Sequence, residues 1–197
     1  MKPQLIIALI FLGFSYTLSA QSIKKDTVLM RRLDTMFKYD QFWRKEYAKV
    51  MRKEKSAYDE DSVQKNWATA DSLNEIEAKK ILKAYGYPGY DLVNEKGSEQ
   101  FWAIAQHCDD DVAFQDRVLK LMKVQVAKNN ANKENYALLV DRVLVNKHQK
   151  QIYGTQVHVD PKTHKATPLP LKYPKSVNKL RRQVGMEPLE KYLKSFE

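Results

Sequence analysis

The chain has 197 residues, 43% of them hydrophobic, a net charge of +10 at pH 7 and a single cysteine. One cysteine excludes an intramolecular disulfide, and the length suits a single domain that is stabilised by its own hydrophobic core. Acidic residues alternate with the basic ones, and no aromatic ladder or nucleic-acid motif accompanies them. A nucleic-acid partner is therefore not expected.

Residues 1–20 are typical of a secretory signal peptide. Lys2 supplies the positive start, Leu5–Phe14 is an almost uninterrupted apolar run, and Leu18-Ser19-Ala20 offers a small-residue cleavage site. The run is shorter than the roughly 20 apolar residues that span a bilayer. We therefore expect an exported protein, periplasmic or secreted, in which residues 21–197 form one domain. No stable membrane insertion is expected after cleavage of the signal.

Five helices are predicted between residues 27 and 147. Apolar residues that recur every three or four positions mark the inward face of each helix. The acidic run Asp109–Asp111 ends the third helix and caps the fourth. The predicted helices are Thr27–Lys55, Ser62–Tyr85, one that is capped by Ser98 and holds Phe101–Ala105, Val112–Lys128, and Glu134–Lys147.

The pattern changes after residue 150. Gln151–Val159 alternates between apolar and polar residues, and Lys165–Leu169 can return as its partner, which predicts a β-hairpin over residues 151–169. Gly154 inside the first strand indicates a bulge or a close backbone approach. Two short helices, Ser176–Val184 and Pro188–Phe196, follow. The expected fold class is mainly α: a single helical domain of about six helices with a small β-hairpin near the C-terminus.

Asp141 and Arg142 are the most informative residues, because the other seven residues of Ala137–Val145 are all apolar. Such a stretch belongs in a core, and a charged group stranded there costs several kcal/mol unless polar partners meet it. We expect both residues to be held by polar partners from other helices.

Polar residues also interrupt the apolar faces of the first three helices. A helical bundle would bring such side chains together at its centre. At helical spacing, Gln41 and Arg44 interrupt the first face, Asp71 and Asn74 interrupt the second, and Gln106 and His107 close the third.

These positions fall in motifs that occur in a fixed order. They are Asp40-Gln41-x-x-Arg44, Asp71-x-x-Asn74, Gly86-Tyr87-Pro88, Gln106-His107-x-Asp109, Asp141-Arg142, Gln151-Ile152-Tyr153-Gly154-Thr155-Gln156 and Arg181-x-x-x-Gly185-Met186-x-Pro188-Leu189-x-x-Tyr192. In them the chain resembles a bacterial family known as domain of unknown function 6624, often carried on exported proteins. The Tyr-Gly-Thr-Gln segment is the most specific part. The resemblance implies no activity, and suggests that the polar positions belong to one recurring unit.

Three kinds of function remain open. In a structural or interaction protein, the polar side chains form a buried network. In a binding module, they hold a glycan or a peptide. In a hydrolase or transferase, His107 is the general acid or base, and Asp109 or Asp141 orients it. A solvent-open cavity around His107 and Asp141 would favour binding or catalysis, whereas closure would favour the structural network.

The partner alternatives are an envelope glycan, a peptide and a protein. Arg44 or Arg142 would hold an anionic group by a bidentate contact. The candidates for ligand contacts are Gln41, Arg44, Asp71, Asn74, Gln106, Arg142, Tyr153 and Gln156.

No cofactor and no metal site are predicted. The candidate metal ligands His107, Asp109, His158 and His164 lack the spacing of a known site. Cys108 follows apolar residues at helical spacing, so we expect it to be buried and structural.

Overall fold

The computed structural model describes residues 24–196, and the predicted signal peptide lies outside this range. The structure is 66% helical, and its described part contains seven α-helices and a two-stranded antiparallel hairpin near the C-terminus. The mainly α prediction is therefore confirmed. Within residues 24–196, no helix combines the length and the apolar character needed to cross a membrane.

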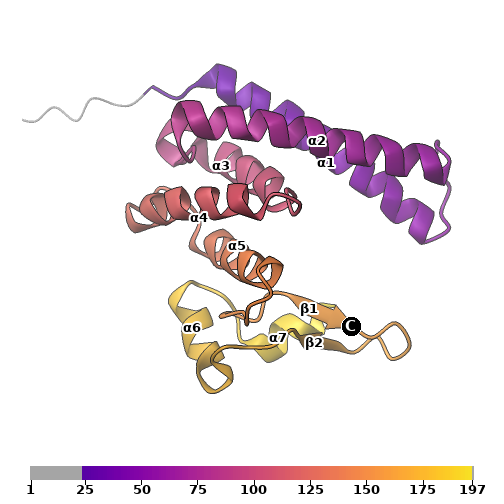
Figure 1. Ribbon diagram of the computed structural model, residues 1–197, viewed down its shortest axis with the longest axis vertical. Coiled ribbons are helices and arrows are strands. Elements are labelled where there is room, and N and C mark those ends of the chain that lie inside the picture. The colour runs from indigo at the N-terminus through magenta and orange to yellow at the C-terminus, as the bar shows by residue number, and fades with distance from the viewer. Residues whose placement is uncertain (1–23, 197) are drawn as a thin grey trace, which may run out of the picture.

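The helices are stacked in chain order from one end of the molecule to the other (Figure 1). Two long helices form a pair at one end, and the third helix packs against both of them. The fourth and fifth helices pack on each other, and the fifth also contacts the third. The bounds are α1 Thr27–Met51, α2 Glu60–Tyr85, α3 Tyr90–Gln106, α4 Val112–Ala127 and α5 Lys133–Asn146.

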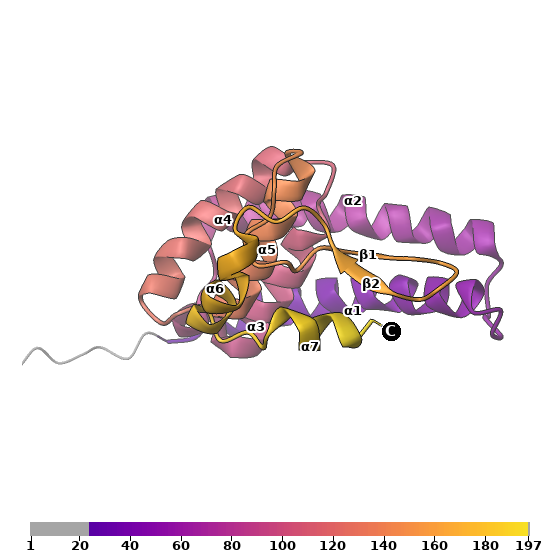
Figure 2. The same cartoon turned by 90° about the horizontal axis from the view of Figure 1, so that it is seen from below.

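The C-terminal part lies at the far end of this stack (Figure 1), and Figure 2 shows the same segments from below. In the hairpin, Val157 is opposite Pro168 and Val159 is opposite Ala166. The segment Gln151–Gln156 was predicted as part of the first strand but lies outside it, for a reason given below. The elements here are β1 Val157–Val159, β2 Ala166–Pro168, a 3-10 turn Pro174–Ser176, α6 Val177–Gln183 and α7 Leu189–Lys194.

Side-chain caps mark the first turns of α1, α2, α4 and α5. Asp111 caps α4 as predicted, since its carboxylate accepts from the Phe114 N–H at 2.7 Å. The predicted cap of the third helix was wrong: Ser98 is buried inside α3. Asn94 takes that role. It has a φ of 60°, which kinks α3, and its side-chain oxygen accepts from the Gly97 N–H at 2.9 Å.

The hydrophobic core runs through α1 to α5. Its fully buried members include Leu33, Phe101, Phe114, Met122 and Leu139. The inward face of α1 differs from the predicted one, because Gln41 and Arg44 are only partly buried, whereas a neighbouring row is buried. The buried row is Leu29, Leu33, Met36, Asp40, Trp43 and Glu46, and it places two carboxylates inside the packed face.

Candidate functional site

A polar cavity of about 430 Å³ opens between α1, α2, the end of α3 and α5. It gathers residues that lie more than 90 positions apart in the sequence. Five of the predicted site residues line it: Arg44, Asp71, His107, Asp109 and Arg142.

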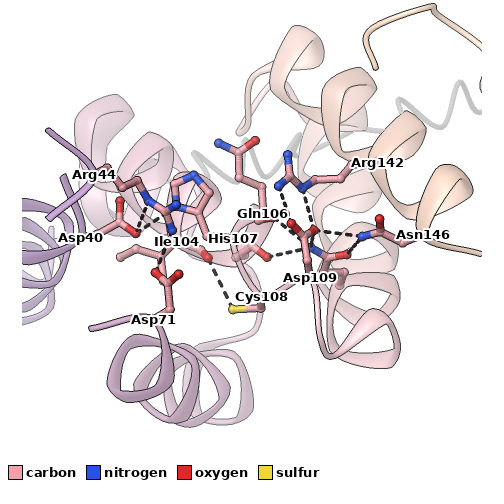
Figure 3. A network of polar contacts seen from close by, with 12 residues as sticks. Asp40, Arg44, Asp71, Ile104, Gln106, His107, Cys108, Asp109, Arg142 and Asn146 are labelled. Atoms are coloured by element: carbon pink, nitrogen blue, oxygen red, sulfur yellow. Dashed lines mark hydrogen bonds and ion pairs between the residues drawn. The ribbon is translucent and has the colours of Figure 1, made fainter. Parts of the chain in front are cut away.

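The first polar cluster in this cavity centres on the pair His107 and Asp40. Nδ1 of His107 lies 2.9 Å from Oδ1 of Asp40, and Figure 3 shows the two side chains pointing toward each other. Asp40 is only 1% exposed, whereas the His107 side chain is 17% exposed and lines the cavity. The structure thus places an imidazole at the cavity wall with a buried carboxylate behind it.

Arg44 joins Asp40 to a second carboxylate, that of Asp71. Its Nε donates to Oδ1 of Asp40 at 3.1 Å, and its second terminal nitrogen, Nη2, donates to Oδ1 of Asp71 at 2.7 Å. The guanidinium carbon also lies 4.9 Å from the ring centre of Trp67. One arginine therefore bridges α1 and α2, and its charge is shared between two acidic groups.

The two carboxylates have opposite pKa shifts. Burial raises the pKa of Asp40, but the hydrogen bond from His107 and the charges of His107 and Arg44 outweigh burial, so the net pKa is lowered. Burial raises the pKa of Asp71; Arg44 opposes this, the Asp40 charge reinforces it, and the net pKa is raised. Because Asp40 is ionised at neutral pH, it only accepts, and the Nδ1 proton of His107 must point toward it.

The second polar cluster centres on Asp109. Arg142 approaches its carboxylate in a bidentate manner, with Nε 2.7 Å from Oδ1 and Nη2 on Oδ2. Asn146 donates to Oδ1 at 2.9 Å, and Gln115 donates to the same oxygen at 3.1 Å. Figure 3 shows Arg142 and Asn146 converging on Asp109. Partial burial raises the pKa of Asp109, but the contacts with Arg142 and Asn146 outweigh burial, so the net pKa is lowered.

Cys108 is buried, as predicted, and its Sγ donates to the Ile104 carbonyl at 3.4 Å. Burial raises the pKa of this thiol to about 12. The sulfur is therefore protonated at neutral pH and is a poor nucleophile.

Asp141 lies in a different environment from its neighbour Arg142. It is fully buried, and its carboxylate accepts from the backbone N–H groups of Ile152, Tyr153 and Thr155 at 2.7 to 3.1 Å. The Thr155 hydroxyl donates to it as well, at 3.1 Å. The partners of Asp141 thus come from the loop that follows α5, and the expectation of partners from other helices was wrong for this residue.

The side chains of Arg181 and Gln151 also hold the backbone of this loop in place. Arg181 is 1% exposed and donates to the carbonyls of Tyr153 and Glu187 at 2.7 and 2.6 Å. The Gln151 amide donates to the carbonyls of Gln156 and Leu169, both at 2.8 Å. Since these bonds use the backbone of residues 151–156, this backbone is not free to extend β1. The closed network fits a structural role.

The predicted site residues therefore divide into two groups, and the expectation that all of them meet in one centre was wrong. Gln41 reaches the first cluster, since its amide donates to Asp40 at 2.8 Å. Asn74 is buried and donates to the Met36 carbonyl at 3.3 Å. Tyr153 and Gln156 belong to the closed loop around Asp141. Gln106 contributes its backbone carbonyl, which accepts from Gln115 at 3.0 Å.

Asp40 is the main residue that was missing from the predicted site. Its signal was present in the sequence, because it stands in a row of apolar residues with alternating steps of four and three. The row is Leu29, Leu33, Met36, Asp40 and Trp43. The predicted face was one position away, where Gln41 and Arg44 stand, so a buried carboxylate was overlooked.

Among residues 24–196, no three His, Cys, Asp or Glu side chains are grouped so that they could hold a metal ion. The carboxylates at the cavity are held by arginines and amides instead.

Comparison with known proteins places the chain in a family without an assigned activity. A protein-family model described as a family of unknown function (DUF6624) matches residues 28–197 of the chain. No curated protein and no solved structure matches the chain.

Proposed function

The chain belongs to the family of unknown function DUF6624, and from its polar cavity we propose that it is an exported enzyme that performs acid–base chemistry on a polar ligand. The proposal rests on one observation, the contact between Asp40 and His107. A buried carboxylate that holds Nδ1 of an imidazole at a cavity wall is the arrangement that orients a general base.

In this proposal His107 moves the proton. With its Nδ1 proton directed at Asp40, the neutral imidazole presents Nε2 as an acceptor. Among the described residues Nε2 has no hydrogen-bond partner, so it is available to a water molecule or a ligand hydroxyl. Asp40 orients the ring and stabilises the imidazolium that forms.

Asp71 is the second acid–base group in the proposal. Asp40 and Asp71 share Arg44, and their pKa values are shifted in opposite directions. Such a split is the pattern by which two neighbouring carboxyl groups take different roles. Asp71 is the one able to carry a proton closer to neutral pH and to pass it to a leaving group.

The proposal uses water rather than a protein nucleophile. The buried Cys108 thiol, with its raised pKa, is unsuited to attack. His107 would take a proton from water, the resulting hydroxide would attack the ligand, and Asp71 would protonate the leaving group. Arg44 and Arg142 flank the cavity, and their guanidinium groups favour the negative charge that develops in this step. This is hydrolysis, and the developing negative charge fits cleavage of a peptide bond better than cleavage of a glycosidic bond, which develops positive charge.

A second candidate is a binding module that uses the same cavity without turnover. The aromatic pair Tyr47 and Trp67 favours it, because its ring centres lie 4.7 Å apart and Trp67 lines the cavity beside Arg44. An aromatic wall with polar neighbours suits a sugar ring or a peptide. For the Asp141 loop we propose a purely structural role.

The test uses defined probes: muropeptide fragments of peptidoglycan, acidic oligosaccharides and a mixture of short peptides. Product formation is followed by mass spectrometry and binding by calorimetry, with wild type, His107→Ala and Asp40→Asn. If one probe is cleaved, both variants should lose at least about 100-fold in rate, the usual contribution of a general base. His158→Ala, an exposed histidine on β1, is the matched control and should keep full activity.

The outcomes separate the candidates. Cleavage that depends on His107 supports the enzyme. Binding of a probe without cleavage, lost in an Arg44→Ala variant, supports the binding module. If no probe class is bound or cleaved while the variants fold normally, both candidates are rejected in favour of a structural protein.

A further inference from the structure

A second cavity, apolar rather than polar, lies between α2 and α4. It measures about 580 Å³, and seven residues line it. Leu82, Phe114 and Leu121 form its apolar surface, and the side chains of the other four residues surround them. These four are all cationic: Lys79, Lys83, Arg117 and Lys120. We call this feature the α2–α4 groove.

Two of the four cations have no acidic partner. Lys79 pairs with Glu75 and Asp111, and Lys120 pairs with Asp116. Lys83 and Arg117 form no ion pair with any residue in the described range of the chain. The groove therefore presents uncompensated positive charge, one group on each of its two helices.

Exposed apolar side chains lengthen the groove along both helices. Leu121 is 40% exposed, and Val124 is 50% exposed one turn farther along α4. On α2, Ile76 is 53% exposed and stands one turn before Lys79 and Lys80. An apolar strip of this kind that is bordered by charge is typical of a surface that meets a partner.

We propose that the α2–α4 groove binds an acidic amphipathic helix of a partner protein. The apolar side of such a helix would pack on the exposed Leu121 and the accessible edge of Leu82, above the buried Phe114, with contacts at i, i+3, i+4 and i+7. Acidic residues on its two flanks would meet Lys83 on one side and Arg117 on the other. This binding does not rest on the proposed catalytic function, because the groove and the His107 cavity share no lining residue.

The shape of the surface favours a helix over a membrane. The surface is a hollow of about 580 Å³ between two helices rather than a flat apolar face. A bilayer surface is met by apolar side chains that project outward from a helix face. A recessed floor is reached by a convex ligand such as a helix.

The test uses a labelled synthetic helix of about 18 residues, or five turns, with leucines along one face and glutamates on both flanks. Fluorescence anisotropy with the full chain is the measurement. A micromolar dissociation constant is expected, and Leu121→Glu and Arg117→Glu should each weaken binding by roughly tenfold. Both side chains are at the surface, so both variants should keep the circular dichroism spectrum of wild type.

Matched controls exclude a general effect of added negative charge. The control variants are Val28→Glu, at an exposed apolar residue of α1, and Arg182→Glu, at an exposed basic residue of α6. Neither should change the affinity by more than about twofold. A peptide with lysines in place of the glutamates should not bind. The affinity for the acidic peptide should fall as salt is raised.

Three results would overturn the proposal. In the first, the acidic peptide fails to bind at micromolar concentration. In the second, acidic and basic peptides bind equally, which indicates unspecific apolar contact. In the third, phosphatidylglycerol vesicles bind and displace the peptide while Leu121→Glu abolishes vesicle binding, which would make the groove a membrane contact.

Discussion

Asp141 and Arg142 are adjacent in the sequence but serve different parts of the molecule. Consecutive side chains on an α-helix point about 100° apart, so the two project from α5 in different directions. Asp141 organises the loop Ile152–Thr155, whereas Arg142 faces the cavity and holds Asp109. A pair that looks like one polar unit in the sequence is two units in the structure.

This difference leads to a prediction about stability. Asp141→Ala removes the acceptor of three backbone N–H groups and of the Thr155 hydroxyl. The free energy of unfolding should fall by about 3–5 kcal/mol. Urea denaturation followed by circular dichroism measures it.

Arg142→Ala is the matched control, one residue away. Its pair with Asp109 is partly exposed, with the two side chains 28% and 43% accessible, so the loss should stay near 1 kcal/mol or below. Equal losses in the two variants, or an unchanged Asp141→Ala, would contradict the assignment of Asp141 to a closed network.

At the scale of elements, the short segment after α5 controls how the C-terminal part packs. Gly154 has a φ of +71°, and a Cβ placed there would lie 2.9 Å from Leu189 Cδ1 and 3.3 Å from Leu171 Cδ2. The backbone of the loop thus approaches α7 closely, as the glycine inside the predicted strand indicated. The loop is held between Asp141 on α5 and Leu189 on α7.

Gly154→Ala should therefore destabilise the protein for two reasons, backbone strain and a steric clash. Gly86→Ala shares the first reason alone, because Gly86 has a φ of +70° but no atom lies within 4 Å of its added Cβ. The difference between the two variants in the free energy of unfolding isolates the clash, and we expect this difference to be about 1–3 kcal/mol. Gly86→Ala with an equal or larger loss would contradict the close packing on α7.

The helix pair α1 and α2 builds one wall of the cavity, and the segment after α3 builds the other together with α5. The turn after α3 supplies His107 and Asp109, whereas Arg44, Asp71 and Arg142 come from helix interiors. A change in how α1 and α2 pack on α3 would therefore alter the distance between Asp40 and His107.

At the scale of the whole molecule, export is a prediction that rests on residues 1–20. When the full chain is expressed in a bacterial host, the extracytoplasmic fraction should contain a protein whose first residue is near Gln21. N-terminal sequencing of that fraction measures it. Leu9→Arg places a charge in the apolar run and should keep the chain in the cytoplasm, uncleaved. Wild type found only in the cytoplasm with Met1 intact would contradict export.

The whole molecule also separates two kinds of polar network. The network around Asp141 is closed by the chain itself and stabilises the packing of the hairpin and α7. The network around His107 and Asp109 lines an open cavity. One cluster lines an open cavity and the other is closed by the chain, and this difference is the reason that we propose different roles for the two.

The sequence alone determined the fold class, the position of most helices, the small hairpin and the burial of Cys108. These features follow from local patterns: a period of three to four residues, capping side chains and turn residues. The sequence also identified Arg44, Asp71, His107, Asp109 and Arg142 as polar residues on or beside apolar faces.

Only the tertiary structure decided which of these residues meet. The burial of Asp40 depends on the rotation of α1 by one residue against α2 and α3, and a periodic pattern fits neighbouring rotations almost equally well. The separation of Asp141 from Arg142 depends on where the loop after α5 returns. Both are set by packing between elements that are distant in the chain, so no local pattern of residues contains them.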